Sequence, residues 1–200
     1  MKKTCRLFLL LLTLMMTLSG CITSEKDIYQ RINEKYSSLN SYFAKCEATV
    51  WGNKTKNKYE FEVYFKSPDM LKLDYITNGI EILMQSDKVV LKNPGINHTI
   101  ELNGENCDYI NFLINAFFEN YYVGETGSVD VASGPISNYT LLECELASGN
   151  DYARSQKLYI DNKTTHPKRL LTLDAKGDVV IEVEFTEFNF NDARIDAAFN

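Results

Sequence analysis

The start of the chain limits what the rest can be, because residues 1–21 match a bacterial export signal that ends in a cysteine. A positively charged beginning is followed by an apolar run over residues 7–18, which is shorter than the roughly 20 residues that cross a bilayer. The run leads into Leu18-Ser19-Gly20-Cys21, the small-residue pattern of a lipoprotein signal peptide. We therefore expect residues 1–20 to be removed and Cys21 to be lipidated. The alternative is an ordinary secretory signal with a chance cysteine.

A lipid on Cys21 determines where everything after it works. Several acyl chains, each methylene contributing about 0.8 kcal/mol of burial, hold a protein at a membrane surface for a long time. We expect the mature chain to lie on the extracytoplasmic side of the membrane. A protein held in this way suits the role of scaffold, acceptor or local regulator better than that of a shuttle.

Length and charge favour one acidic domain. Removal of residues 1–20 from the 200-residue chain leaves 180, enough for a single domain, residues 21–200, with its own core. The signal takes three cations with it, Lys2, Lys3 and Arg6, so the formal net charge changes from −6 to −9. This balance argues against a nucleic-acid partner and against broad adhesion to anionic lipid heads.

The cysteines allow few cross-links. Cys5 leaves with the signal and Cys21 is expected to be acylated, so Cys46, Cys107 and Cys144 remain. Three is an odd number, and at most one internal disulfide can form. We expect these cysteines to be mostly buried, small apolar residues, with one disulfide as the alternative.

The segment after Cys21 has the pattern of a helix followed by strands. Ser24 and Asp27 form a capping box, and an apolar stripe then indicates a helix of about four turns. The stripe consists of Ile28, Ile32, Tyr36 and Leu39. From Tyr42 apolar and polar residues alternate, as in half-buried strands, and turn signals such as Asn78-Gly79 separate the runs. We expect strands near residues 59–66, 71–75, 80–85, 87–92, 97–102, 138–146, 155–161, 168–174 and 178–190.

A second helix interrupts the strands. Its apolar residues recur at helical spacing, with Asn106 as a candidate N-cap and Gly124 as a candidate stop. They are Ile110, Leu113, Ile114, Phe117, Phe118 and Tyr121. We expect this aromatic face to plug the concave side of a curved sheet. The alternative is that Phe117 and Phe118 line a groove for an acyl chain or for a partner's apolar side chain.

Together these elements predict an α+β fold, with a curved antiparallel β-sheet of about eight or more strands, a half-barrel, wrapped over helices. In the last strand the apolar side changes between Phe185 and Phe188, which predicts a β-bulge near Thr186-Glu187. An open sheet leaves edges that can pair with a second copy or exchange a strand with it. We therefore expect that a homodimer can form.

No arrangement of residues indicates catalysis, so we expect a protein that is not an enzyme and has no catalytic residues, cofactor or metal. His98 is expected in an edge strand and His166 in the turn before Pro167, and neither has a metal ligand at motif spacing. Three pairs of carboxylates are expected on solvated strand faces: Glu60/Glu62, Glu143/Glu145 and Glu182/Glu184. A hydrolytic carboxylate pair, or a thiol nucleophile formed by a cysteine and a histidine, remains the alternative.

Four motifs, taken in order, resemble the LolA/LolB/RseB-like lipoprotein superfamily over roughly residues 27–199. The first is the end of the helix, Tyr36-Ser37-Ser38-Leu39-Asn40-Ser41-Tyr42, and the others are residues 67–75, 158–167 and 183–191. Within this superfamily the chain is similar to the clostridial spore germination lipoproteins. Cys21 departs from the soluble carriers of the superfamily, which argues against shuttling.

The resemblance implies a role at the extracytoplasmic face of the cell or forespore membrane. It implies a non-catalytic lipoprotein that binds and activates a zinc-dependent N-acetylmuramoyl-L-alanine amidase of the CwlD type. Such a pair makes the muramic-δ-lactam of the spore cortex that germination requires. The alternative that the same superfamily implies is a lipid- or hydrophobe-binding acceptor, or an envelope-stress sensor, of the LolB/RseB type.

Overall fold

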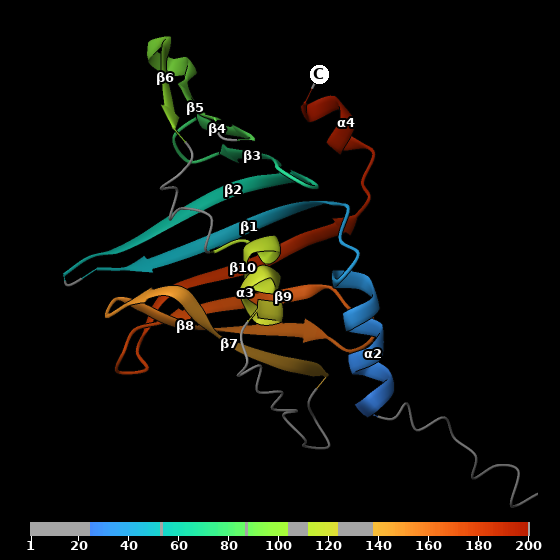
Figure 1. The fold of residues 1–200 in the computed structure, drawn as a ribbon. Helices are drawn as coiled ribbons and strands as arrows, with labels where there is room; N and C mark the ends of the chain where they lie inside the picture. The colour runs from blue at the N-terminus through green and yellow to red at the C-terminus, as the bar shows by residue number, and fades with distance from the viewer. Residues whose placement is uncertain (1–24, 53, 87, 104–111, 124–137, 200) are drawn as a thin grey trace, which may run out of the picture.

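Ten strands pair into one antiparallel sheet in the computed structural model (Figure 1). The structure describes residues 25–52, 54–86, 88–103, 112–123 and 138–199. The strands are β1 (Ser41–Trp51), β2 (Lys56–Lys66), β3 (Met70–Tyr75), β4 (Ile80–Gln85), β5 (Lys88–Asn93), β6 (His98–Asn103), β7 (Tyr139–Asn150), β8 (Ala153–Asp161), β9 (Pro167–Leu173) and β10 (Val179–Phe190). The α-helices within the described residues are α2 (Glu25–Tyr36), α3 (Ile114–Val123) and α4 (Arg194–Ala198).

The first and last strands lie side by side in the middle of the sheet. β1 pairs with β2 on one side and with β10 on the other, which gives the order β6-β5-β4-β3-β2-β1-β10-β9-β8-β7. One meander therefore runs outward from β1 to β6, and a second returns from β7 to β10. The predicted fold class, a curved antiparallel sheet of eight or more strands with helices, is confirmed.

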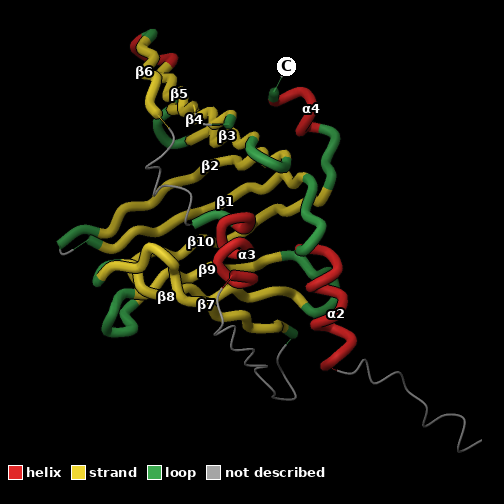
Figure 2. The backbone as a smooth tube through the Cα atoms, viewed as in Figure 1, coloured by secondary structure: helices red, strands yellow, loops and turns green. Residues whose placement is uncertain are grey.

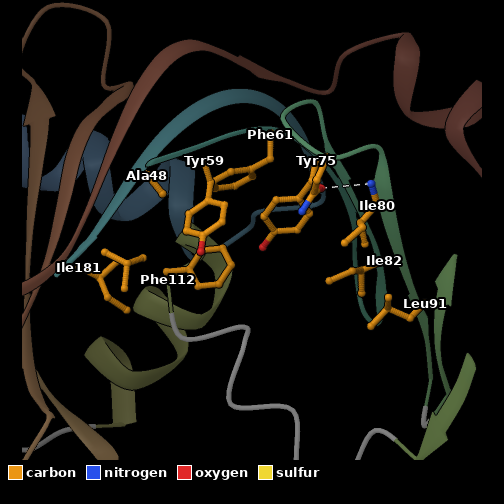
Figure 3. A pocket seen from close by; sticks show the side chains of 11 residues that line it. Ala48, Tyr59, Phe61, Tyr75, Ile80, Ile82, Leu91, Phe112 and Ile181 are labelled. Atoms are coloured by element: carbon orange, nitrogen blue, oxygen red, sulfur yellow. Dashed lines mark hydrogen bonds between the residues drawn. The ribbon is translucent and has the colours of Figure 1, made fainter. Parts of the chain in front are cut away.

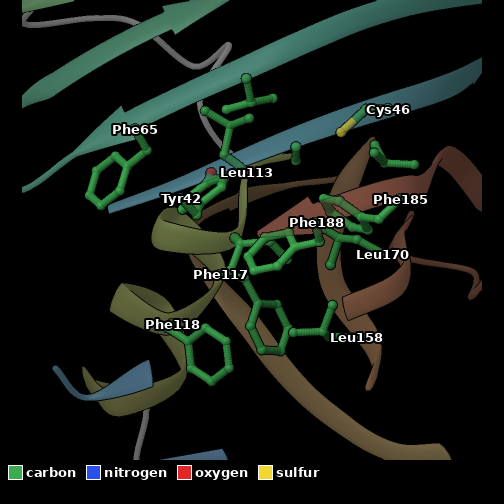
Figure 4. Close-up of a cluster of buried hydrophobic side chains, with 14 of the residues drawn as sticks. Tyr42, Cys46, Phe65, Leu113, Phe117, Phe118, Leu158, Leu170, Phe185 and Phe188 are labelled. Atoms are coloured by element: carbon green, nitrogen blue, oxygen red, sulfur yellow. The ribbon is translucent and has the colours of Figure 1, made fainter. Parts of the chain in front are cut away.

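The sheet curves around α3, which lies against its concave side (Figures 1 and 2). Leu113, Ile114, Phe117 and Phe118 are all buried there among side chains from the strands (Figure 4). The prediction that this aromatic face plugs the sheet is confirmed. The helix begins at Ile114, later than a cap at Asn106 would place it, and Asn106 and Gly124 themselves lie outside the described residues.

Strand β1 shows how alternation builds this core. Tyr42, Ala44, Cys46 and Ala48 are buried on the concave side, whereas Lys45 and Glu47 alternate with them on the convex side. Three of the four concave side chains are small, so the centre of the sheet leaves room for the large aromatic side chains of α3. The Tyr42 hydroxyl donates to Asn115 Oδ1 at 3.1 Å and ties the strand to the helix.

A β-bulge in β10 changes which residues face the core. Lys45 lies opposite Glu187 and Cys46 opposite Phe185, so Thr186 is the extra residue. Its hydroxyl donates to the Lys45 carbonyl at 3.1 Å. Val183 and Phe185 before the bulge, and Phe188 after it, are consequently buried on the same side. The predicted bulge near Thr186-Glu187 is confirmed.

Helix α2 packs through Ile32 and Tyr36 and ends at Tyr36, before the Leu39 that the sequence stripe included. The amide of Ser37 bonds to the Asn33 carbonyl, and the hydroxyl of Ser38 bonds to the Glu34 carbonyl at 2.9 Å. A serine hydroxyl that takes a helix carbonyl competes with the next amide, so the helix stops there. Ser24 and the side chain of Asp27 lie outside the described residues.

The short helix α4, which was not predicted, covers part of the convex face. Ile195 is buried, and the Arg194 guanidinium lies 3.5 Å from the ring centroid of Phe43. Arg194 also bonds to Glu187 and Asp192, each at 2.7 Å. Phe43 is therefore fully buried although it points away from the main core.

Candidate functional site

An apolar pocket opens on the concave side of the sheet, between the strands and Phe112, which precedes α3 (Figure 3). Its volume is about 320 Å³, near the lower limit for pockets that bind small molecules. Side chains from six strands line it together with Asn78 and Phe112: Ala48, Val50, Tyr59, Phe61, Tyr75, Ile80, Ile82, Leu91 and Ile181. Ala48 on the central strand leaves part of this space open because its side chain is only a methyl group, and a larger residue would fill the space.

Aromatic rings form one wall of the pocket. The ring of Phe61 lies 5.3 Å from that of Tyr75 and 5.7 Å from that of Phe112, the latter edge-on at 76°. Burial raises the pKa of Tyr75, and the neighbouring Tyr59 raises it further, so this phenol stays neutral. None of the lining residues that the structure describes is acidic, basic, a histidine or a cysteine. The described part of the pocket can therefore hold an apolar group, and it carries no carboxylate, amine, imidazole or thiol for acid–base or nucleophilic chemistry.

Phe117 and Phe118 lie in the core and do not line this pocket. The residue of this segment that does line it is Phe112, which precedes the helix. Of the two sequence interpretations, the structure supports core packing for the aromatic face of α3. The groove exists, but other residues form it.

The paired glutamates lie on the convex face, as expected. Glu62 pairs with Lys45 at 3.1 Å and Glu143 with Lys157 at 2.7 Å. Longer contacts join Glu145 to Arg154 and Glu182 to Arg169. Cross-strand ion pairs of this kind are ordinary features of a solvated sheet face and contribute little individually.

Three glutamates on this face lie opposite one another. Glu47 on β1 lies directly opposite Glu60 on β2 and Glu184 on β10, so like charges face one another across three strands. Directly opposed like charges are destabilising. Lys56 and Lys58 line the same cleft as these glutamates and lower the local negative charge.

The two histidines are far apart in the sheet order. His98 is exposed at the start of the edge strand β6, as predicted. His166 lies in the turn before Pro167, and its ring is 5.7 Å from that of Phe188 and 5.6 Å from that of Phe190. Burial lowers its pKa, as do Lys168 and Lys35. Neither histidine is placed beside a nucleophile or a set of metal ligands in the described part of the chain.

Cys46 and Cys144 are buried free thiols, as predicted, and Cys107 lies outside the described residues. Burial raises the pKa of Cys46 strongly and that of Cys144 to about 12, which makes both poor nucleophiles. In the described ranges, His, Cys, Asp and Glu side chains form no group of three that could hold a metal ion.

The helices of those ranges include none that is long and apolar enough to cross a membrane.

The outermost strand of the first meander, β6, is exposed on both faces. Ile100 and Leu102 keep 42% and 46% of their surface exposed, although they continue the apolar concave face from Leu91 and Val89 opposite them. Because β6 ends the order of the strands that the structure describes, one row of its backbone amides and carbonyls has no strand partner among them. The edge therefore combines open hydrogen-bonding groups with exposed apolar side chains.

Sequence reasoning did not find the pocket. Its lining comes from segments as far apart as Ala48 and Ile181, and only the pairing of β1 with β10 brings them together. The one signal available was the run of small residues on the inward face of β1, Ala44, Cys46 and Ala48, which indicates space that something else must fill.

Comparison with known proteins decides the family. The family model for YdcC-like sporulation proteins matches residues 1–199. The chain belongs to the YdcC-like family of sporulation proteins. A curated relative, sporulation protein YdcC of Bacillus subtilis (strain 168), is 25% identical over 207 residues, which cover 96% of this chain and 59% of the relative. This YdcC-like chain thus spans about three fifths of the length of that relative.

Solved structures resemble the YdcC-like chain as well. A chain in the structure of the CwlD amidase from Clostridioides difficile in complex with the GerS lipoprotein matches with a TM-score of 0.53 and 27% identity, over 84% of this chain and 96% of that chain. An uncharacterized conserved protein from Thermus thermophilus matches with a TM-score of 0.50 and 12% identity, over 86% and 91%, which shows the fold alone. The family and the amidase-complex match confirm the resemblance that the sequence motifs indicated.

Proposed function

We propose that this chain is a membrane-anchored, non-catalytic lipoprotein that binds and activates a zinc-dependent N-acetylmuramoyl-L-alanine amidase of the CwlD type. The product would be the muramic-δ-lactam of the spore cortex that germination requires. The observation that carries the proposal is the match to a chain of the CwlD–GerS complex, at 27% identity and over 84% of this chain. The sporulation family supports the cellular context.

The chemistry of the described residues fits a partner rather than a catalyst. The described lining of the pocket has no carboxylate, amine or imidazole, and burial raises the pKa values of the described thiols. Activation then has one physical route, in which the lipoprotein binds the competent state of the amidase more tightly than the inactive state. The metal and the bond cleavage would belong to the partner.

We place the amidase-binding surface at the edge of β6, where open backbone groups adjoin Ile100 and Leu102. A partner strand added there would gain main-chain hydrogen bonds and bury these side chains. The matched control site is Tyr152, which is 76% exposed at the β7–β8 turn and far from β6 in the sheet order.

The test is amidase activity on cortex peptidoglycan with and without residues 22–200 of this chain. We expect activity to rise with added wild-type protein, to stay at its basal level with Ile100→Lys, and to rise normally with Tyr152→Lys. Equal amidase activity at saturating wild-type protein would remove the proposal. Full activation by Ile100→Lys would keep the partner but move its interface away from β6.

Lipidation of Cys21, after removal of residues 1–20, is part of the same proposal and places residues 21–200 at the extracytoplasmic face of the cell or forespore membrane. Its support is the residue pattern that ends in Cys21. Labelling cells with a palmitate analogue should mark the wild-type chain and leave Cys21→Ala unmarked. Labelling of both forms would show that the lipid is elsewhere.

Self-association through a sheet edge, by pairing or by strand exchange, is a further element of the proposal. An open β6 edge supports it, because unpaired edges template the pairing of a second strand. Light scattering after size exclusion should report a dimer for residues 22–200 and a monomer for Ile100→Lys. A wild-type monomer at high concentration would contradict it.

A second candidate function, binding of an acyl chain or similar hydrophobe, is favoured by the apolar pocket of about 320 Å³. Mass spectrometry of purified protein should then find lipid in the wild type and little in Ala48→Phe, which fills the pocket. Thr49→Phe, on the opposite face of the same strand, is the matched control and should keep the lipid. Absence of lipid from the wild type would leave the pocket without this role.

A further inference from the structure

Four cations gather where α2 meets the turn between β8 and β9. Arg31 donates to the carbonyls of Asn162 and Lys163, at 3.4 and 3.1 Å, so the helix flank and the turn are in contact. Lys35 lies one helical turn after Arg31 on the same flank, and Lys168 is exposed at the start of β9. We call Arg31, Lys35, Lys163 and Lys168 the basic face.

None of the four cations forms an ion pair in the described structure. No described carboxylate side chain lies within 4.0 Å of any of them. The carboxylate of Asp161 accepts from the Thr164 amide and hydroxyl and from the Lys163 amide, and Lys168 helps to lower its pKa. Glu34 on α2 accepts from the neutral amide of Gln30 at 2.8 Å. These two carboxylates offset part of the positive charge, and the four cations of the basic face outnumber them.

The surroundings of His166 give an independent sign of positive potential here. Lys168 and Lys35 both act on its ring, and after burial they are the next causes of its lowered pKa, whereas Asp161 opposes them. The ring is therefore neutral near pH 7 and adds no charge. Lys35 also lies 4.7 Å above the ring of Phe190, which holds its stem against the body of the protein.

A second group of lysines, Lys54, Lys56 and Lys58 at the β1–β2 hairpin, differs in its setting. Lys56 and Lys58 line one cleft with Glu47, Glu60, Glu182 and Glu184, so glutamates offset their charge. The mature chain carries a net charge of −9 after loss of the three signal cations. The basic face is thus a locally positive surface on an acidic protein.

The basic face is also close to the expected anchor. Four residue steps separate Cys21 from Glu25, the first residue of α2, and an extended chain of that length spans at most about 14 Å. If α2 lies along the membrane surface, the helix flank with Arg31 and Lys35 is brought within about one Debye length, roughly 8–10 Å, of the headgroups.

We propose that the basic face docks on anionic lipid headgroups and holds α2 along the membrane surface. The proposal rests on the lipidation of Cys21 for its location, but not for its chemistry, which is charge complementarity between exposed cations and an anionic leaflet. It gives the anchored domain a defined orientation, so that the same surfaces always point away from the membrane.

The test uses residues 22–200, which contain all of the buried core side chains of the described structure, from Ile32 to Ile195, and lack the acylation site. Sedimentation with vesicles of equal parts phosphatidylglycerol and phosphatidylcholine should show salt-sensitive binding, and pure phosphatidylcholine should show none. The triple variant K35Q/K163Q/K168Q should bind the anionic vesicles at least about tenfold more weakly, because each lysine near such a surface contributes roughly 1 kcal/mol. The control K54Q/K56Q/K58Q loses the same charge and should bind like the wild type.

Two outcomes would overturn the proposal. The first is absence of binding to anionic vesicles, and the second is an equal loss of binding in both triple variants. If vesicle binding is absent and K35Q/K163Q/K168Q also loses a protein partner, the basic face belongs to a protein interface. Because these vesicles test an unacylated chain, failure here is separable from failure of palmitate labelling at Cys21.

Discussion

Removing one oxygen atom from Tyr36 tests how α2 is fixed to the sheet. Its hydroxyl donates to the Thr165 carbonyl at 2.8 Å, and both residues are buried. In Tyr36→Phe the ring still stacks on Phe118 at 4.1 Å between centroids, so packing is kept and the hydrogen bond is lost. A net hydrogen bond contributes about 1 kcal/mol, and a buried carbonyl left without its donor costs about 1–3 kcal/mol. We expect the free energy of unfolding to fall by about 2 kcal/mol.

Urea unfolding of residues 22–200 is the assay. The midpoint should fall while the slope with urea concentration stays unchanged, which marks a change in stability rather than in the denatured state. For a domain of this size, about 2 kcal/mol corresponds to a fall in the melting temperature of roughly 4–8 °C. Amide hydrogen exchange should rise most in α2, since the lost bond is the buried one of the hydrogen bonds that link it to the β8–β9 turn.

Tyr42→Phe is the matched control. Its buried hydroxyl also donates once, but to the side-chain oxygen of Asn115, at 3.1 Å. Asn115 is half-buried and can turn its amide toward water, whereas the Thr165 carbonyl is fixed by the backbone. We therefore expect a smaller loss than for Tyr36→Phe. A loss below about 0.5 kcal/mol for Tyr36→Phe, or a larger loss for Tyr42→Phe, would refute the reasoning.

Four further predictions concern the core, its two thiols and one surface carboxylate. Phe117→Ala should lower the free energy of unfolding by about 3–5 kcal/mol in urea titrations, because the ring is fully buried. Cys46 and Cys144 should resist a thiol reagent at pH 8 until the protein unfolds. Burial raises the pKa values of both thiols, so their contribution to the free energy of unfolding should be fully present below pH 9, the ordinary thiol pKa. Above pH 9 the free energy of unfolding should fall as pH rises, and it should fall less in a Cys46→Ala/Cys144→Ala double variant. Arg194 lowers the pKa of Asp192 to about 2, so an NMR titration should show Asp192 ionised down to that pH and a higher pKa in Arg194→Gln.

The fold could be predicted from the sequence because its signals are local. Alternation along each strand, the change of parity between Phe185 and Phe188, and the helical spacing around Phe117 each follow from a few neighbouring residues. Asn78-Gly79 marks the β3–β4 turn, where Gly79 has a φ of 65° that other residues rarely adopt. Such patterns determine which face of an element is buried, and burial of apolar faces determines the sheet.

The pocket, and the packing of α4 on the convex face, could not be predicted in the same way. The pocket depends on which strands become neighbours, and the pairing of β1 with β10 joins parts of the chain that are far apart in sequence. Helix α4 is too short for periodicity to indicate it, and its position depends on contacts with distant strands, such as Arg194 on Phe43 and Asp196 with Lys66. The pocket and the position of α4 depend on contacts between segments far apart in the sequence, and local propensity does not determine them.

The basic face and the β6 edge lie in opposite parts of the molecule, so the proposed membrane docking would place them at different distances from the membrane. Seven strand spacings separate β9 from β6 in the sheet order, about 34 Å along the curved sheet at roughly 4.8 Å per spacing (Figure 1). This distance is several Debye lengths at physiological salt. With α2 against the headgroups, as proposed, β6 would point into the aqueous space, where the proposed amidase partner could reach it. Substitutions in the two regions share no contacts, so their effects on vesicle binding and on amidase activation should be independent and additive.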